Sequence, residues 1–177
     1  MKIYKKIMMS FDKNVLYFYT VTNTKKQIIV MLGKTTEYSI RSLVYIYIQN
    51  MKGERPGFKE IAKNIDSPEE FTGKVLQIIT RAGLVSSMKG RGGGFFFDNT
   101  KKPLTLLDVI NVTEGNEFFH KCGFGLKSCD ANNPCPMHDE YATVRESFYN
   151  LVNRLTIQSL ASKVNHNKAI LNRLEIG

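Results

Sequence analysis

The sequence predicts a mainly helical fold with one small β-hairpin, arranged as a winged helix-turn-helix and followed by a long C-terminal helix. Three observations support this prediction. Two short helical segments flank a tight turn between residues 58 and 83, and a glycine-rich basic tip separates two short β-prone segments between residues 84 and 97. A sustained apolar stripe then runs along residues 139–154.

The first fifty residues contain two patterns. Residues 1–30 mix Lys with aromatic and β-branched residues without a sustained period, so we regard them as an N-terminal extension of unknown role. A readable pattern starts at Met31, which is a candidate for the natural start of the protein. The segment from Tyr38 to Asn50 is ambiguous, because Val44–Ile48 alternates like a strand while its length favours a helix.

The helix-turn-helix follows a turn at Pro56-Gly57. Phe58–Asn64 is the first short helix. Ser67 is then the expected N-cap of a second helix, with a proline at the first helical position and Glu70 at the third, which is the pattern of a capping box. Gly83 is the expected C-terminal cap of this helix.

The hairpin comprises Leu84–Met88, the basic tip Lys89–Gly94 and Phe95–Phe97. Its glycines allow positive φ angles and a close approach of the backbone to a phosphate. A nucleotide-binding loop is the alternative, but the tip matches neither G-x-G-x-x-G nor a Walker loop, and it precedes a strand instead of a helix. We therefore interpret it as a wing.

The C-terminal half contains two more helices. Thr105 is the expected N-cap of a helix that reaches about Thr113 and ends before Gly115. The long helix from about residue 139 to 154 needs a partner for its stripe, either the domain itself or a second subunit. The stripe consists of Tyr141, Val144, Phe148, Leu151, Val152 and Leu155.

Composition and charge restrict the class of protein. No segment approaches the roughly 20 apolar residues of a membrane helix, and three cysteines do not form a secreted disulfide framework, so we expect a cytoplasmic protein without membrane contact. The net charge is +9. Residues 1–30 and 31–102 each carry +5 and residues 103–177 carry −1, so we expect a polyanion to bind the first half.

The three cysteines form one polar, turn-rich cluster. Cys122, Cys129 and Cys135 are separated by six and five residues, and His138 follows the last by three. Structural cysteines sit in apolar surroundings, so this loop favours a metal or a cluster. Structural zinc usually binds short C-x2–4-C pairs, whereas the wider spacing suits a larger iron–sulfur cluster.

The chain resembles the Rrf-type family of bacterial winged-helix regulators, in its IscR- and NsrR-like, cluster-binding branch. The resemblance spans Met31 to about Ala161 and assigns Glu37–Asn50 to a helix. Its most specific parts are Lys34–Tyr38, Glu60-Ile61-Ala62, Arg81–Ser87, Lys89-Gly90, Gly92–Phe95, Leu104–Leu106 and Glu114-Gly115.

This resemblance implies a homodimeric transcriptional regulator that reads a palindromic operator in double-stranded DNA. The winged helix-turn-helix is then a DNA-binding domain over residues 31–102, and residues 103–177 form a cysteine-loop sensor and dimerisation region. The second helix would enter the major groove. The candidate DNA contacts are Ser67, Glu70, Thr72, Lys74, Gln77, Lys89 and Arg91, the last in place of the proline common in the family.

The sensor that the resemblance implies is an iron–sulfur cluster, with [2Fe–2S] favoured over [4Fe–4S]. The three cysteines would be ligands, and the remaining ligand would be His138 or Glu37, with His138 preferred. Such a cluster would sense redox state, nitric oxide or iron supply. The alternatives are the same regulator with zinc or thiol-based sensing, and a small metalloenzyme, for which the sequence offers no general-base constellation.

Overall fold

The computed structural model describes residues 8–12, 15–19, 32–98, 100 and 102–172, and it divides the chain into two compact units after Gly33. In the first unit, β1 (Met8–Asp12) and β2 (Val15–Tyr19) form an antiparallel hairpin in which Met8 opposes Tyr19. The remaining expectations for residues 1–30, and the candidate start at Met31, lie outside the described residues.

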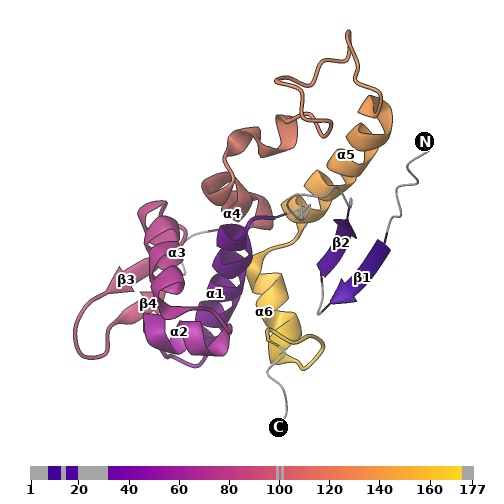
Figure 1. The fold of residues 1–177 in the computed structure, drawn as a ribbon. Coiled ribbons are helices and arrows are strands. Elements are labelled where there is room, and N and C mark those ends of the chain that lie inside the picture. Colours follow the sequence, from indigo (N-terminus) through magenta and orange to yellow (C-terminus); the bar gives the residue numbers. More distant parts are fainter. Residues whose placement is uncertain (1–7, 13–14, 20–31, 99, 101, 173–177) are drawn as a thin grey trace. The chain divides into compact units, whose positions relative to one another are not determined.

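The second unit is mainly helical with one β-hairpin, as predicted (Figure 1). Its elements, in chain order, are α1 (Lys34–Met51), α2 (Phe58–Asn64), α3 (Glu69–Arg81), β3 (Ser86–Met88), β4 (Gly94–Phe96), α4 (Leu106–Thr113), the 3-10 helix η1 (Asn116–His120), α5 (His138–Arg154) and α6 (Ile157–Asn165). The strands β3 and β4 pair antiparallel and form the wing.

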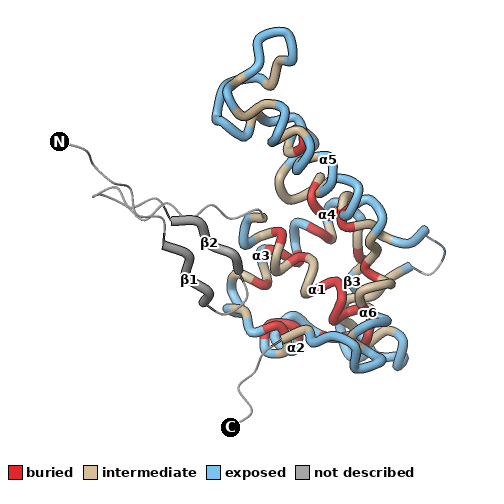
Figure 2. Tube along the Cα trace, turned by 90° about the vertical axis from the view of Figure 1, so that its right-hand side faces the viewer, coloured by how far each residue is buried: buried red, intermediate tan, exposed pale blue. Residues whose placement is uncertain are grey.

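The core of this unit is built around α1, which packs against α2, α3, α4 and α6 (Figure 2). Leu43 and Ile46 of α1 are fully buried, as are Ile61 of α2 and Ile79 of α3. The strand-like alternation of Val44–Ile48 is therefore overridden by tertiary packing, because a helix covered on several sides needs apolar residues around most of its circumference.

A partly buried polar contact joins α1 to α2. The hydroxyl of Tyr45 donates a hydrogen bond to Oε1 of Glu60 at 3.0 Å. Burial, followed by this contact with the Glu60 carboxylate, raises the pKa of Tyr45 to about 12. The tyrosine therefore stays protonated and keeps donating throughout the physiological range of pH.

The start of α3 differs from the predicted capping box. Pro68 occupies the N-cap position and no side chain caps the helix. The Ser67 hydroxyl instead bonds to the hydroxyl of Thr72 at 2.8 Å, and Thr72 also donates to the carbonyl of Pro68 at 3.0 Å. The Ser67 hydroxyl, which the predicted capping box required, is therefore bonded to the fully buried Thr72 instead of capping α3. Glu70 is exposed.

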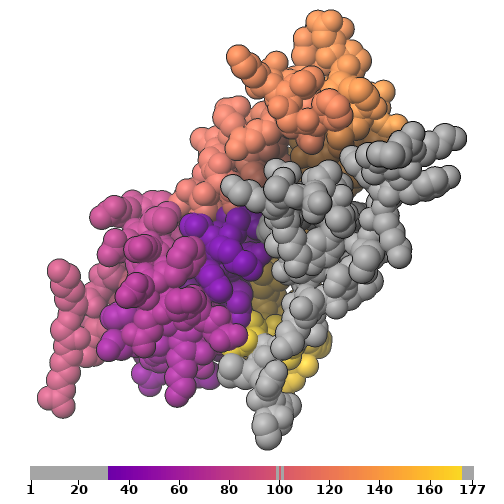
Figure 3. Space-filling view, in the orientation of Figure 1, coloured from indigo at the N-terminus to yellow at the C-terminus, as the bar shows by residue number. Residues whose placement is uncertain are grey.

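The wing is fastened to the turn between α1 and α2. The backbone N–H of Phe95 donates to the carbonyl of Pro56, and the Asn50 side chain bonds to the carbonyl of Phe95 and the N–H of Phe97. Gly94 lies so close to this turn that an added Cβ would be 2.2 Å from the carbonyl oxygen of Arg55. Beyond these anchors the wing tip projects from the helices (Figure 3).

The C-terminal part confirms the predicted cap and adds a helix. Thr105 and Asp108 form a capping box at α4, and Gly115 adopts a φ of 90° after its end. Sequence analysis did not recognise α6 as a separate helix. It starts with a second capping box, between Thr156 and Ser159, and it packs on α1.

A glycine substitution tests the attachment of the wing. We expect Gly94→Ala to lower the free energy of unfolding by about 3 kcal/mol, because the new methyl group meets the Arg55 carbonyl and the φ of +143° disfavours a side chain. Gly92→Ala is the matched control, with a positive φ but open space, and should cost about 1 kcal/mol. Urea unfolding followed by circular dichroism measures both. Equal losses would contradict this packing.

Candidate functional site

The exposed face of α3 presents a row of polar side chains. Glu70, Lys74 and Gln77 are exposed and lie at steps of four and three residues, so they share one face of the helix. Ser67 is half-buried at the start of this face, whereas the complete burial of Thr72 contradicts its assignment as a surface contact. Sequence reasoning missed the exposed Arg81. This residue lies four positions after Gln77, so helical periodicity places it in the same row.

The wing adds positive charge beside this helix. Lys89 and Arg91 are both exposed at the tip, where Gly90 and Gly92 have φ angles of 94° and 75°. A groove of about 390 Å³ separates α3 from the wing. It is lined by Phe58, Gly73, Leu76, Gln77, Thr80, Arg81, Ser87 and Phe95.

Arg55 is a second cation that the sequence analysis did not select. Its guanidinium lies 4.6 Å from the centroid of the Phe96 ring, and its Nη1 is 3.5 Å from the sulfur of Met88. It thus contacts both strands of the wing. An exposed helix face beside a basic wing is suited to the phosphates and groove edges of a duplex.

The cysteine loop joins η1 to α5 and lies at the end of α5 farther from α6 (Figure 1). The structure arranges its predicted ligands as two pairs. The sulfurs of Cys122 and Cys135 are 3.8 Å apart, and the sulfur of Cys129 is 3.5 Å from Nδ1 of His138. Among the described residues, no group of three or more potential ligands is assembled at one point.

The spacing within each pair fits a tetrahedral metal ion. Two thiolates bound about 2.3 Å from one such ion lie about 3.8 Å apart, and a thiolate with an imidazole nitrogen lies about 3.5 Å apart. Both distances in the structure are compatible with the separation of two ligands on one metal ion. The donor types, thiolates and imidazole, suit zinc or iron–sulfur chemistry.

Hydrogen bonds within the loop also affect the acidity of one cysteine. The pKa of the Cys122 thiol is lowered, chiefly by a hydrogen bond from the backbone N–H of Leu126. The backbone N–H groups of Phe124 and Gly125 and the contact with Cys135 lower it further, whereas burial opposes the shift. All three cysteines are free and half-buried. The sulfurs are therefore accessible and one of them is biased toward the thiolate.

Glu37, the other predicted ligand, lies apart from these pairs within the chain. It sits in the first turn of α1, where its carboxylate pairs with Lys34 at 2.6 Å. That position also suits an acidic residue near a helix N-terminus. The chain itself therefore brings His138, and not Glu37, to the cysteines.

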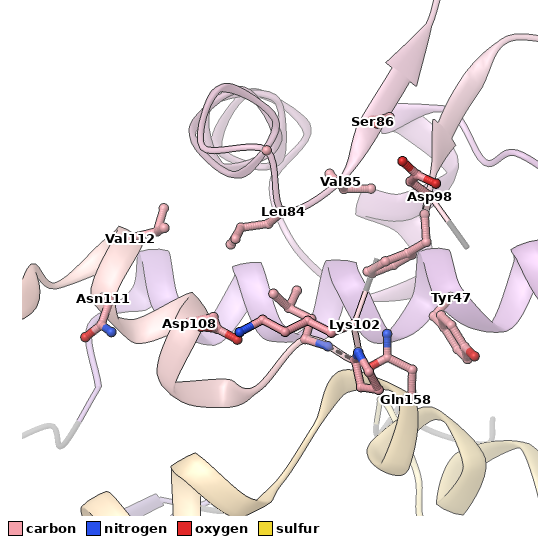
Figure 4. Close-up of a pocket in the computed structure, with 14 residues that line it drawn as sticks. Tyr47, Leu84, Val85, Ser86, Asp98, Lys102, Asp108, Asn111, Val112 and Gln158 are labelled. Carbon is pink, nitrogen blue, oxygen red and sulfur yellow. Dashed lines mark hydrogen bonds between the residues drawn. The ribbon is translucent and has the colours of Figure 1, made fainter. Parts of the chain in front are cut away.

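A cavity of about 500 Å³ lies where the winged helix meets α4 and α6 (Figure 4). Two of its polar side chains already have structural partners. The Asp108 carboxylate belongs to the capping box of α4, and Oε1 of Gln158 accepts a hydrogen bond from the N–H of Leu104 at 3.1 Å. The cavity therefore contributes to the junction of the two parts of this unit.

The helices that the structure describes include none that is long and apolar enough to cross a membrane.

Comparison with known proteins gives a consistent result. Residues 32–163 match the family described as Rrf2, iron-dependent transcriptional regulator. The protein aau3 of Rhizobium meliloti is 32% identical over 130 residues, which cover 73% of this chain and 83% of that protein. The transcriptional repressor NsrR of Streptomyces coelicolor is 23% identical over 137 residues, covering 74% and 88%.

Two solved structures share the fold. The global cysteine regulator CymR of B. subtilis superposes with a TM-score of 0.62 at 18% identity, over 76% of this chain and 98% of that one. IscR of T. potens superposes with a TM-score of 0.60 at 18% identity, over 78% and 90%. The matched family and the relatives whose names state a role are regulators, so the metalloenzyme alternative is set aside.

Proposed function

Because this chain belongs to the Rrf2 family of DNA-binding transcriptional regulators, we propose that it is a homodimer that controls transcription through an iron–sulfur cluster in its cysteine loop. The cluster would report redox state, nitric oxide or iron supply. The observation that carries the proposal is the arrangement of Cys122 with Cys135, and of Cys129 with His138, as two pairs at metal-ligand spacing.

The proposed DNA interface is the exposed face of α3 together with the wing. The helix enters the major groove with its N-terminal residues nearest the bases, so Glu70 approaches base edges and Lys74 approaches base edges or phosphates. Gln77 follows one turn later. Lys89 and Arg91 contact phosphate or the minor groove from the wing. Ser67 remains a candidate at the edge of this interface, and the buried Thr72 is not part of it.

A second copy of the chain is the proposed partner of α5. Val144 and Leu151 lie seven residues apart on this helix and are 57% and 41% exposed, although both are apolar. Tyr149 adds a further exposed ring. An isologous contact along α5 would place two winged helices about a twofold axis, which matches a palindromic operator.

The two pairs favour a [2Fe–2S] cluster. Each of its two irons takes two protein ligands, so Cys122 and Cys135 would hold one iron, and Cys129 and His138 the other. When bound, the cluster supplies a reversible one-electron change, and replacement of a thiolate by His raises its potential. Glu37 of a second copy is the alternative fourth ligand.

The proposed switch is a change in the order of the loop. His138 is the first residue of α5, so a ligand event at His138 acts directly on the dimer helix. Release of the loop would alter the position of α5 and thereby the spacing of the two α3 helices.

Thiol-based sensing is a second candidate function. The 3.8 Å between the sulfurs of Cys122 and Cys135, with the lowered pKa of the Cys122 thiol, favours a disulfide between them. Hydrogen peroxide would accept the two electrons, so that the two thiols and one peroxide give one disulfide and two waters. Metal analysis separates this reading from the cluster.

The contribution of the wing can be measured from the salt dependence of DNA binding. We expect Lys89→Ala to weaken binding to a palindromic duplex selected from random DNA and to reduce the log–log slope against salt by about 0.9, because one phosphate contact is lost. Lys163→Ala removes an exposed cation from α6 and should leave the slope unchanged. A parental slope in the Lys89 variant would remove this residue from the interface.

The cluster itself can be tested by anaerobic purification. The parental chain should be coloured and contain about two irons and two acid-labile sulfides per chain. Cys129→Ala should lose the colour, whereas substitution of the exposed neighbour, Ser128→Ala, should retain it. A colourless chain with zinc, or with no metal and a Cys122–Cys135 disulfide after peroxide, would favour the second candidate.

A further inference from the structure

Arg145 lies on the face of α5 that contacts the cysteine loop. Its Nη1 is 3.3 Å from the sulfur of Cys129 and 3.5 Å from the backbone oxygen of Lys121, the residue before Cys122. One nitrogen therefore reaches two parts of the loop that are eight residues apart in sequence. These contacts play no role in the ligand set described above.

Tyr141, one turn earlier on α5, supports the same segment. Its ring packs against Gly123, where an added Cβ would lie 2.6 Å from three ring atoms. The guanidinium of Arg145 is 5.8 Å from the centroid of this ring. His138, Tyr141 and Arg145 follow steps of three and four residues, so they form one stripe along α5 toward the loop.

The charge of Arg145 matters as much as its position. A guanidinium stays protonated at all physiological pH values, so it presents a permanent cation to Cys129. Hydrogen bonds to ligating sulfurs and the net charge nearby set the potential of an iron–sulfur cluster. A cation that donates to a ligating sulfur stabilises the reduced cluster, which is the more negative state.

We propose that Arg145 is a positioning residue that fastens Cys129 to α5 and raises the reduction potential of the cluster through its hydrogen bond to that sulfur. The first part is a property of the chain alone, and the second rests on the proposed function. Cys129 thus contacts α5 at two positions, at His138 and at Arg145 seven residues later. A change at Cys129 would therefore act on the proposed dimer helix through both.

Two substitutions separate the charge from the contact. Arg145→Gln removes the cation, and Arg145→Lys keeps it on a shorter donor. Arg154→Gln is the control, since Arg154 is exposed in the last turn of the same helix. Thermal melting of each full-length variant checks that the fold is retained.

The first measurement is a redox titration of the anaerobically purified variants, in which visible absorption reports the oxidation state of the cluster. The midpoint potential should become more negative in Arg145→Gln and remain near the parental value in Arg145→Lys and Arg154→Gln. A parental midpoint in Arg145→Gln, with the cluster retained, would overturn the electrostatic part while leaving the proposed function in place.

The second measurement needs no cluster. The cluster-free chains are digested with a lysine-specific protease, and cleavage after the exposed Lys127 is followed by intact mass. Cleavage should be about tenfold faster in Arg145→Gln, because a charged hydrogen bond that orders the loop is lost. A rate equal to that of Arg154→Gln would overturn the fastening role. If even the parental chain binds no cluster, the proposed function fails and this digestion still decides the role of Arg145.

Discussion

The structure of the cysteine loop depends on contacts that hold it in place without a hydrophobic core of its own. None of the residues from 121 to 137 is buried, and the apolar side chains of Phe124 and Leu126 are 54% and 51% exposed. Hydrophobic burial therefore contributes little to its order. What holds the loop are the ring of Tyr141 against Gly123, the hydrogen bonds of Arg145 and the mutual contacts of the cysteines and His138. A structure of this kind is sensitive to a local ligand event.

The winged helix is the opposite case. Helix α1 is enclosed by four other helices, and α4 contacts both α1 and α5. A polar network joins the start of α1 to the end of α4, where the fully buried Thr36 shares a hydrogen bond with Thr113 and donates another to Glu114. The winged helix is thus connected through α4 to α5, the helix that contacts the cysteine loop. Contacts of α4 with α5, α1 and α3 therefore form a continuous packed connection between the loop-bearing helix and α3.

The sequence predicted elements whose determinants are local. The Thr105 cap, the glycine-rich wing tip and the periodic stripe of α5 each depend on neighbours within a few residues, and all were found. Tertiary contacts decided two other points. The buried Thr72 bonds to Ser67, which therefore does not cap α3 as predicted. Packing favoured the helix over the strand in the locally ambiguous segment of α1, as the family resemblance had assigned.

The candidate site shows the same division. The sequence singled out the cysteines by spacing and residue type, and His138 through the family resemblance. The structure places Cys122 beside Cys135, and Cys129 beside His138. Arg145 was not found, since an arginine on a helix has no local feature that distinguishes a sulfur contact from a solvated side chain. Its role emerges only when the loop and the helix are seen together.

The proposed cluster switch is tested most directly by the DNA affinity of one anaerobic preparation before and after removal of its cluster, measured by fluorescence anisotropy on the same selected duplex. We expect dissociation constants that differ by at least about fivefold, the lower range of coupling between two sites in one protein. Equal dissociation constants for the loaded and the cluster-free dimer would contradict it.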